Sequence, residues 1–138
     1  MATVVQAVRQ LLDGLTNLPE MWLTEIPENE PVAPSLVLTH LGDMPEYHIG
    51  PMAETMVPQI EKANFSLEVY DIDSDVAEEY ADEIKTAFAN AILTIGTDSN
   101  VRAYRESYLV EGTKLRDAEG RQVYCASMQY SLKYNTDK

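Results

Sequence analysis

Residues 63–88 read ANFSLEVYDIDSDVAEEYADEIKTAF, in which a strict alternation gives way to a helical repeat. From Ala63 to Tyr70 apolar and polar residues alternate, which is typical of a strand with one buried face. After a short acidic turn, apolar residues recur at steps of three and four, namely Val76, Tyr80, Ile84, Ala87 and Phe88. This spacing predicts an amphipathic helix that packs on the preceding strand.

The acidic turn between the two segments has two interpretations. Asp71, Asp73 and Asp75 have the spacing that opens a calcium loop, but Val76 stands where that loop needs a glycine and Asp82 where it needs a glutamate. Helix capping is the simpler explanation. In particular, Asp75 and the glutamate three residues later resemble a capping box, so we expect the helix to begin there. A weak divalent-ion site near residues 71–75 stays open as an alternative.

The chain closes with two segments, roughly 101–112 and 121–134, joined by a polar turn that ends at Gly120. In the second segment one face would carry Tyr124, Ala126, Met128, Tyr130, Leu132 and Tyr134. This alternation predicts a long antiparallel hairpin. Both faces of its first strand are mixed in character, which would suit a wall with a neighbour on one side.

The first half of the chain is less regular. Val4 to Leu15 has helical apolar spacing, which predicts a helix over residues 3–16. Short β-rich runs follow at 20–26 and 35–41, separated by a proline-rich turn consistent with a hairpin or an open loop. We expect Trp22, in the first run, to be a core anchor. We interpret residues 42–58 as a long loop or arm, which either offers adaptable methionine surface or folds back on its own core.

Together these segments predict one α+β domain over residues 1–138. Its mixed, mainly antiparallel β-sheet would carry an N-terminal helix and one central amphipathic helix packed on it. A chain of this length can bury one core without disulfides or metals.

Composition narrows the function. The 23 acidic and 10 basic residues give a net charge of −13, which repels phosphate and disfavours gripping DNA or an anionic membrane. The charge fits a surface that DNA slides past, although solubility is the plainer explanation. The one cysteine, Cys125, excludes an intrachain disulfide and is expected to be a buried structural thiol in a protein made in the cytoplasm. We see neither a signal peptide nor a membrane-spanning run.

No motif indicates catalysis. His40 and His48 match no zinc pattern, and there is no glycine-rich phosphate loop and no Ser-His-Asp order. We therefore expect no catalytic residue, metal site or cofactor. A carboxylate enzyme using a divalent cation stays open as a minor alternative.

The order of these segments resembles the small tail-terminator and tail-completion proteins of long-tailed bacteriophages, the group around the lambda minor tail protein U. The resemblance rests on the opening helix Val4 to Leu15, the strand at 63–70 running into the helix at 75–88, and the hairpin from Tyr104 to Tyr134. It implies a homo-oligomeric ring, a hexamer, in the virion at the head-proximal end of the tail. There the ring would end tube polymerisation and contact the tail-tube and head-connector proteins, while DNA passes through without specific binding.

The resemblance also suggests site residues. The candidates for a subunit interface are Met44, Tyr47, Met52, Met56, Tyr104, Tyr108 and Tyr130. The candidates for an acidic lumen are Glu78, Glu79, Asp82 and Glu83, for which a solvated helix face is the plainer interpretation. Two other functions stay open. One is a head-completion, neck or tail-tube protein of the same kind of virion, and the other is a small acidic monomeric binding module with Trp22 and the hairpin tyrosines lining its cleft.

Overall fold

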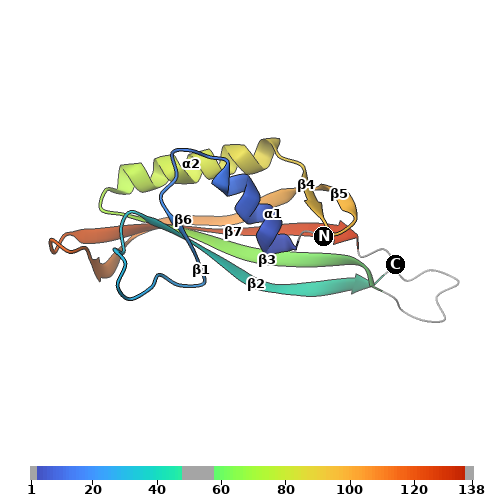
Figure 1. Cartoon of the computed structure of the whole chain (residues 1–138), viewed down its shortest axis with the longest axis horizontal. Helices are drawn as coiled ribbons and strands as arrows, with labels where there is room; N and C mark the ends of the chain where they lie inside the picture. Colours follow the sequence, from blue (N-terminus) through green and yellow to red (C-terminus); the bar gives the residue numbers. More distant parts are fainter. Residues whose placement is uncertain (1–2, 48–57, 136–138) are drawn as a thin grey trace, which may run out of the picture.

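The computed structural model describes residues 3–47 and 58–135 (Figure 1). Two helices and seven strands follow one another along these residues. They are α1 (Val4–Asp13), β1 (Met21–Leu23), β2 (Ser35–Tyr47), β3 (Pro58–Asp71), α2 (Ser74–Asn90), β4 (Leu93–Ile95), β5 (Asp98–Val101), β6 (Ala103–Arg116) and β7 (Gln122–Asn135).

Five of the strands form one sheet in the order β1-β2-β3-β7-β6, and β4 pairs with β5 in a small ribbon. All neighbours in the large sheet are antiparallel except β1 and β2, which are parallel. Both helices pack on one face of this sheet, because their buried side chains join the same core (Figure 1). The α+β class and the mainly antiparallel sheet are therefore confirmed.

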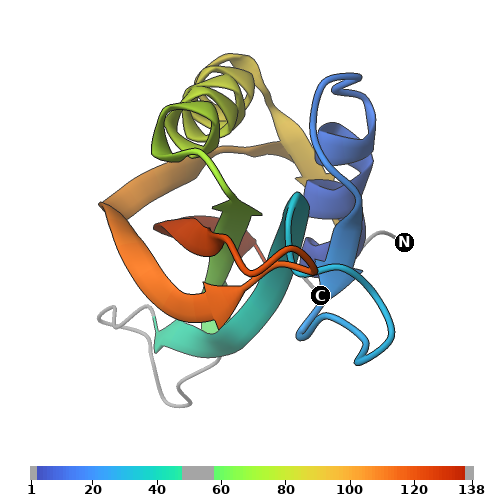
Figure 2. The same ribbon diagram turned by 90° about the vertical axis from the view of Figure 1, so that its left-hand side faces the viewer.

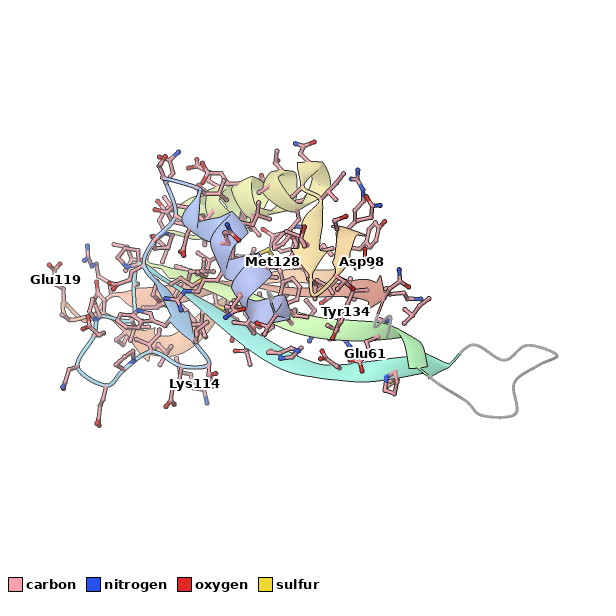
Figure 3. The ribbon with its side chains drawn as sticks, turned by 45° about the vertical axis from the view of Figure 1, so that its right-hand side comes forward. Glu61, Asp98, Lys114, Glu119, Met128 and Tyr134 are labelled. Atoms are coloured by element: carbon pink, nitrogen blue, oxygen red, sulfur yellow. The ribbon has the colours of Figure 1, made fainter. Side chains whose placement is uncertain are left out.

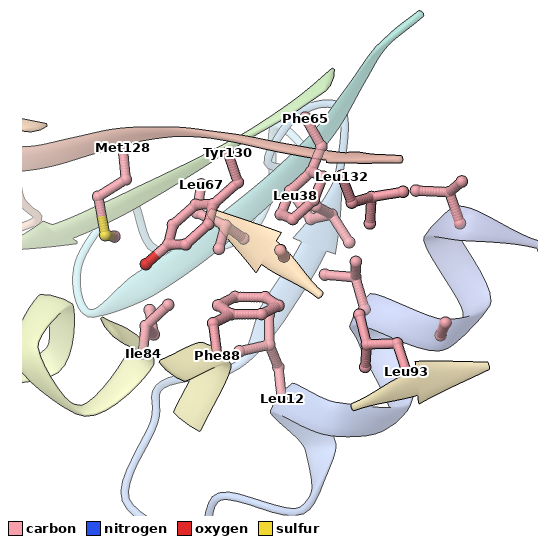
Figure 4. Packing of buried hydrophobic residues seen from close by; sticks show 14 of the residues in the cluster. Leu12, Leu38, Phe65, Leu67, Ile84, Phe88, Leu93, Met128, Tyr130 and Leu132 are labelled. Carbon is pink, nitrogen blue, oxygen red and sulfur yellow. The ribbon is translucent and has the colours of Figure 1, made fainter. Parts of the chain in front are cut away.

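The core lies between α2, α1 and the inner faces of β3 and β7. The alternation in β3 is confirmed, since Ala63, Phe65, Leu67 and Val69 are all 0% exposed. Three aromatic rings join the two layers (Figure 4). The ring centroid of Phe88 on α2 lies 4.6 Å from that of Tyr130 and 5.7 Å from that of Phe65, and Phe65 stacks on Tyr130 at 5.5 Å.

Each helix begins at a side-chain cap. Thr3 and Gln6 form a capping box at α1, with each side chain bonded to the other residue's backbone N–H. At α2 the cap is Asp73, whose Oδ1 accepts from the N–H of Asp75 at 2.9 Å. The predicted cap at Asp75 is thus wrong by two residues, because Asp75 already lies in the first turn.

The segment before β3 differs most from expectation. The runs at 20–26 and 35–41 do not form a hairpin, because β1 lies parallel to β2. The strand β2 also continues through residues 42–47, which were predicted to be loop. Gly42 explains this continuation, since its φ of 127° accommodates a bulge where the register shifts. Residues 48–57, the rest of the predicted loop, lie outside the described residues.

Trp22 is only half-buried and is not part of the main core, in contrast to its predicted role as a core anchor. It pairs with Val37, while the flanking Leu36 and Leu38 belong to the core. Because side chains alternate along a strand, Val37 and Trp22 lie on the sheet face opposite the helices. Neither of the described helices is long and apolar enough to cross a membrane.

Candidate functional site

Exposed hydrophobic side chains gather at the two edges of the sheet. Of the eight large ones that are exposed among the described residues, all but Ile92 lie on β1, β2 or β6. On the β6 edge they are Tyr104, Tyr108, Leu109 and Leu115, and at the other edge they are Leu23, Leu41 and Met44. The strand order places β3 and β7 between β2 and β6, in a sheet whose strong curvature Figure 2 shows. The molecule therefore carries two distinct apolar edges.

Both edges also expose backbone. β6 is the last strand of its sheet, and β1 pairs only with Leu36–Leu38 of β2. Within the described chain, the outer edges of β6 and of β2 after Leu38 therefore have no neighbouring strand, although the N–H of Thr24 donates to the Leu38 carbonyl. Proteins usually protect long free edges, because such edges pair readily with other chains.

Next to Tyr104, an open groove of about 590 Å³, here called the β6 groove, crosses β6, β7 and β3 on the sheet face opposite the helices. It is lined by Lys62, Asn100, Arg102, Tyr104, Glu106, Ser131, Leu132 and Lys133. The hydroxyl of Ser131 donates to Glu106, whose carboxylate also lies 3.6 Å from the Nζ of Lys62. These contacts, the Ser131 bond first, lower the pKa of Glu106. Three of the ten basic residues of this acidic chain thus lie in one groove.

Farther along β6, Tyr108 lies beside α2. The Arg105 guanidinium sits 4.4 Å from the centre of the Tyr108 ring, in cation–π geometry. Burial, and then the carboxylates of Glu78 and Asp82, raise the pKa of Tyr108. The tyrosine is 37% exposed, whereas Tyr104 is 64% exposed. Tyr104 is therefore the more accessible of the two.

The β2 edge is acidic. Its free part, residues 39–47, contains Asp43 and Glu46 and neither lysine nor arginine. The Asp43 carboxylate lies 2.8 Å from His40 Nε2, and the Tyr134 hydroxyl donates to Glu61 at 3.1 Å and to Asp43 at 3.4 Å. Figure 3 shows Tyr134 beside Glu61. Burial, followed by Asp43, raises the pKa of Tyr134, so this hydroxyl stays protonated as a donor.

The acidic helix α2 spreads its carboxylates around its exposed side. Glu78 and Asp82 act on Tyr108, on the β6 side. Glu79, Asp82 and Glu83 line an open groove of about 720 Å³ between α2 and the turn after α1. There the Asn17 side-chain amide donates to Glu83 Oε1 at 3.2 Å.

The predicted interface residues separate into three groups. Met44 and Tyr104 are exposed at opposite edges, and Tyr108 is partly exposed. Tyr130 was wrongly included, because it is 1% exposed and stacks on Phe65 in the core. The side chain of Tyr47, together with Met52 and Met56, lies outside what the structure describes.

Sequence reasoning missed Leu41 and Leu109 as exposed edge residues. The mixed faces of the strand at 103–116 were a usable signal for Leu109. Leu41 could not be found, because the bulge after His40 changes the alternation there.

The isolated polar candidates have structural roles. Cys125 is buried, and burial followed by the Glu68 carboxylate raises its pKa to about 12, so it stays an unreactive thiol as predicted. The Asp71 carboxylate accepts from the N–H of Asp73 at 3.0 Å, which supports the capping interpretation of this turn. Among the described residues no three potential ligands group around a metal position. His48 lies outside those residues.

No protein-family model matches the sequence, and no curated protein matches it. A solved structure, the virion of a native gene transfer agent particle, contains a chain that is similar in fold. The TM-score is 0.64, the sequence identity is 13%, and the match covers 96% of this chain and 95% of that chain. At this identity the likeness shows that the two chains share a fold.

Proposed function

We propose that this protein is a structural component of a phage-type virion that forms a ring at the head-proximal end of the tail. The ring would end polymerisation of the tail tube and present the surface on which the head connector docks. The observation that carries this proposal is the fold shared with a gene transfer agent virion chain over nearly the full length of both. The segment order that resembles tail-terminator proteins supports the same role.

The edges of the sheet suit a ring. A ring needs heterologous contacts, in which two different patches of each subunit meet. The β6 and β2 edges are two such patches, because each exposes its own apolar side chains and an outer strand edge with no neighbour in the described sheet. A head-completion, neck or tail-tube protein would also need two different contact patches. These roles are therefore distinguished by which virion protein each one binds.

The charge of the chain suits a channel for DNA. We place the carboxylates of Glu78, Glu79, Asp82 and Glu83 on the lumen of the ring, where they would repel passing phosphates. Replacing all four with their amides should leave the ring intact but increase its retention of double-stranded DNA at low salt. Unchanged DNA retention would contradict the assignment of these four residues to the lumen.

The first test is the solution mass of the purified protein, measured by light scattering over a concentration series, with negative-stain imaging of large species. We expect a discrete ring. Incubation with the tail-tube protein of the same particle should then cap tube ends, whereas a tube subunit would instead extend them. Aggregates without a defined size would contradict the ring.

A strict monomer would favour the small acidic binding module instead. The open groove between α1 and α2 is the observation that supports this second candidate. Thermal-shift screening with cationic and neutral small molecules would test it, with Glu79→Gln and Asp82→Asn as the groove variants. A ligand whose stabilisation disappears in these variants would establish the module.

A further inference from the structure

We propose that a second copy of this chain pairs the outer edge of its β2, residues 39–44, with the free edge of β6, so that the sheet continues from copy to copy. This inference rests on the proposed ring and names the surfaces that build it.

Strand direction makes the pairing favourable. Along β2, β3, β7 and β6 each strand is antiparallel to the next. The two outer strands β2 and β6 therefore run in opposite directions. In a ring whose copies keep one strand direction, β6 of one copy meets β2 of the next in antiparallel orientation, the commoner and slightly more stable arrangement.

Register places apolar side chains at the same height on the two edges. Gly42 pairs with Asn64, Asn64 with Ser131, and Ser131 with Tyr104, so these residues form one row across the sheet. Leu41, in the bulge beside Gly42, is 51% exposed, and Tyr104 is 64% exposed. A sheet that continues without stagger brings Leu41 of one copy next to Tyr104 of its neighbour, where cross-strand side chains stabilise pairing.

Charge favours the same occupant. The unstaggered register places Asp43 of the incoming β2 in the row of Ala63, Leu132 and Ala103, on the helix-side face of the sheet. There it lies diagonal to Arg105, whose Nη1 has no hydrogen-bond partner among the described residues. The incoming stretch of β2 brings Asp43 and has no basic residue. Two copies that each carry a net charge of −13 repel at a distance, so a stable contact needs local complementarity of this kind.

The ends of the pairing follow from the neighbouring residues. At one end β1 already occupies the edge of β2 opposite Leu36–Leu38. At the other end Pro45 has no backbone N–H to donate. The available stretch is therefore Thr39 to Met44, which includes both exposed apolar residues of this strand, Leu41 and Met44.

Cross-linking of single-cysteine variants tests the proposal. Leu41→Cys and Tyr104→Cys are prepared separately on the native chain, whose buried Cys125 thiol stays unreactive. The two variants are mixed, treated with a short bis-maleimide and analysed by denaturing gel. We expect cross-linked dimers in the mixture and none in either variant alone, because head-to-tail contacts join unlike edges. Mixing Ile92→Cys with Tyr104→Cys is the matched control, since Ile92 is 54% exposed but lies off both edges.

A second variant measures strength. Tyr104→Lys should weaken self-association by about tenfold or more, since loss of a central aromatic contact commonly has that effect. Ile92→Lys should leave it unchanged.

The outcomes separate the two proposals. Rings that form without the Leu41–Tyr104 cross-link would overturn the edge pairing and leave the ring standing. Cross-links within one variant alone would show a contact between like edges, which contradicts the head-to-tail arrangement. A monomer at every concentration, with no cross-link in the mixture, would overturn the pairing together with the ring.

Discussion

Single side chains set the stability of the layer between α2 and the sheet. Phe65, Phe88 and Tyr130 meet there, and all three are nearly or fully buried. Among the described residues, the hydroxyl of Tyr130 has no hydrogen-bond partner. Burial raises its pKa to about 12, so the group is neutral at physiological pH. A buried hydroxyl without a partner lowers stability.

Tyr130→Phe should therefore be neutral or should stabilise the protein by up to about 1 kcal/mol. Urea unfolding followed by circular dichroism would measure the change. Phe88→Ala is the contrasting variant and should lose about 3–5 kcal/mol, because it leaves a cavity beside two rings. A clear loss of stability in Tyr130→Phe would mean that the hydroxyl has a partner after all.

Asp98 should make stability depend on pH. Its carboxylate accepts from the backbone N–H of Asn135 and of Asn100, both at 2.9 Å, and these bonds lower its pKa. A lowered folded-state pKa stabilises the fold above the unfolded pKa of about 3.9, and this stabilisation is lost as pH falls through the folded pKa.

Asp98→Asn should consequently cost about 0.5–1 kcal/mol at pH 7, toward the low end because the site is partly exposed. The difference from wild type should shrink when unfolding is repeated near pH 3. Asp13→Asn, on the exposed end of α1, is the matched control. An equal loss at both pH values would exclude the carboxylate charge as the cause.

At the scale of elements, the start of α2 shows how a sequence signal can be right in kind and displaced in position. Asp71, Asp73 and Asp75 stand in alternate positions before the helix, and each is a residue type that caps well. The cap in the structure is Asp73, whose φ of −123° is extended. Asp75 then lies in the first turn of the helix, where its negative charge interacts favourably with the helix dipole.

Removing the true cap should cost more than removing the acid in the first turn. Asp73→Ala should lose about 1 kcal/mol, whereas Asp75→Ala should lose about 0.3 kcal/mol. Asp73→Asn should retain most of the stability, because asparagine also caps well. The three variants can be compared by thermal unfolding. A larger loss of stability in Asp75→Ala than in Asp73→Ala would show that Asp75 is the cap.

Regular periodicity was the part of the fold that the sequence could predict. β3, α2 and the β6–β7 hairpin each repeat over many residues, so local pattern and tertiary packing agree. The parallel pairing of β1 with β2 could not be predicted, because three residues carry too little pattern to specify a partner. The extent of β2 was missed because a glycine bulge and Pro45 resemble loop composition.

The site was harder to predict than the fold. Met44 and Tyr104, predicted as subunit-interface residues, are exposed and stay candidates for that role, whereas Tyr130 was included because alternation assigns it a face but does not say which face is covered. The β6 groove joins residues from β3, β5, the residue before β6, β6 itself and β7. Such a cluster depends on strand order, which no local pattern contains.

At the scale of the whole molecule, charge should control behaviour in solution. A net charge of −13 on a domain of this size produces self-repulsion that opposes compaction. Raising the ionic strength from about 0.01 M to about 0.15 M shortens the screening length from about 30 Å to about 8 Å.

We therefore expect the melting temperature to rise by about 3 °C over this range. Differential scanning calorimetry at low protein concentration would measure it without contributions from assembly. Neutral sucrose at matched osmolality is the control for solute effects. A falling melting temperature would show that attractive ion pairs, rather than repulsion, dominate.

The central pairing of β3 with β7 has a kinetic consequence. These strands match Asp71 with Tyr124 and Ile60 with Asn135, so α2, β4, β5 and β6 all lie between them in sequence. The middle of the sheet cannot close until β7 has left the ribosome, and loop-closure entropy then slows folding. Until β7 is available, the strands on either side of it have no complete sheet in which to pair. A cell making many copies at once would therefore hold a pool of incomplete chains with exposed strands, for which chaperone capacity limits the yield of folded protein.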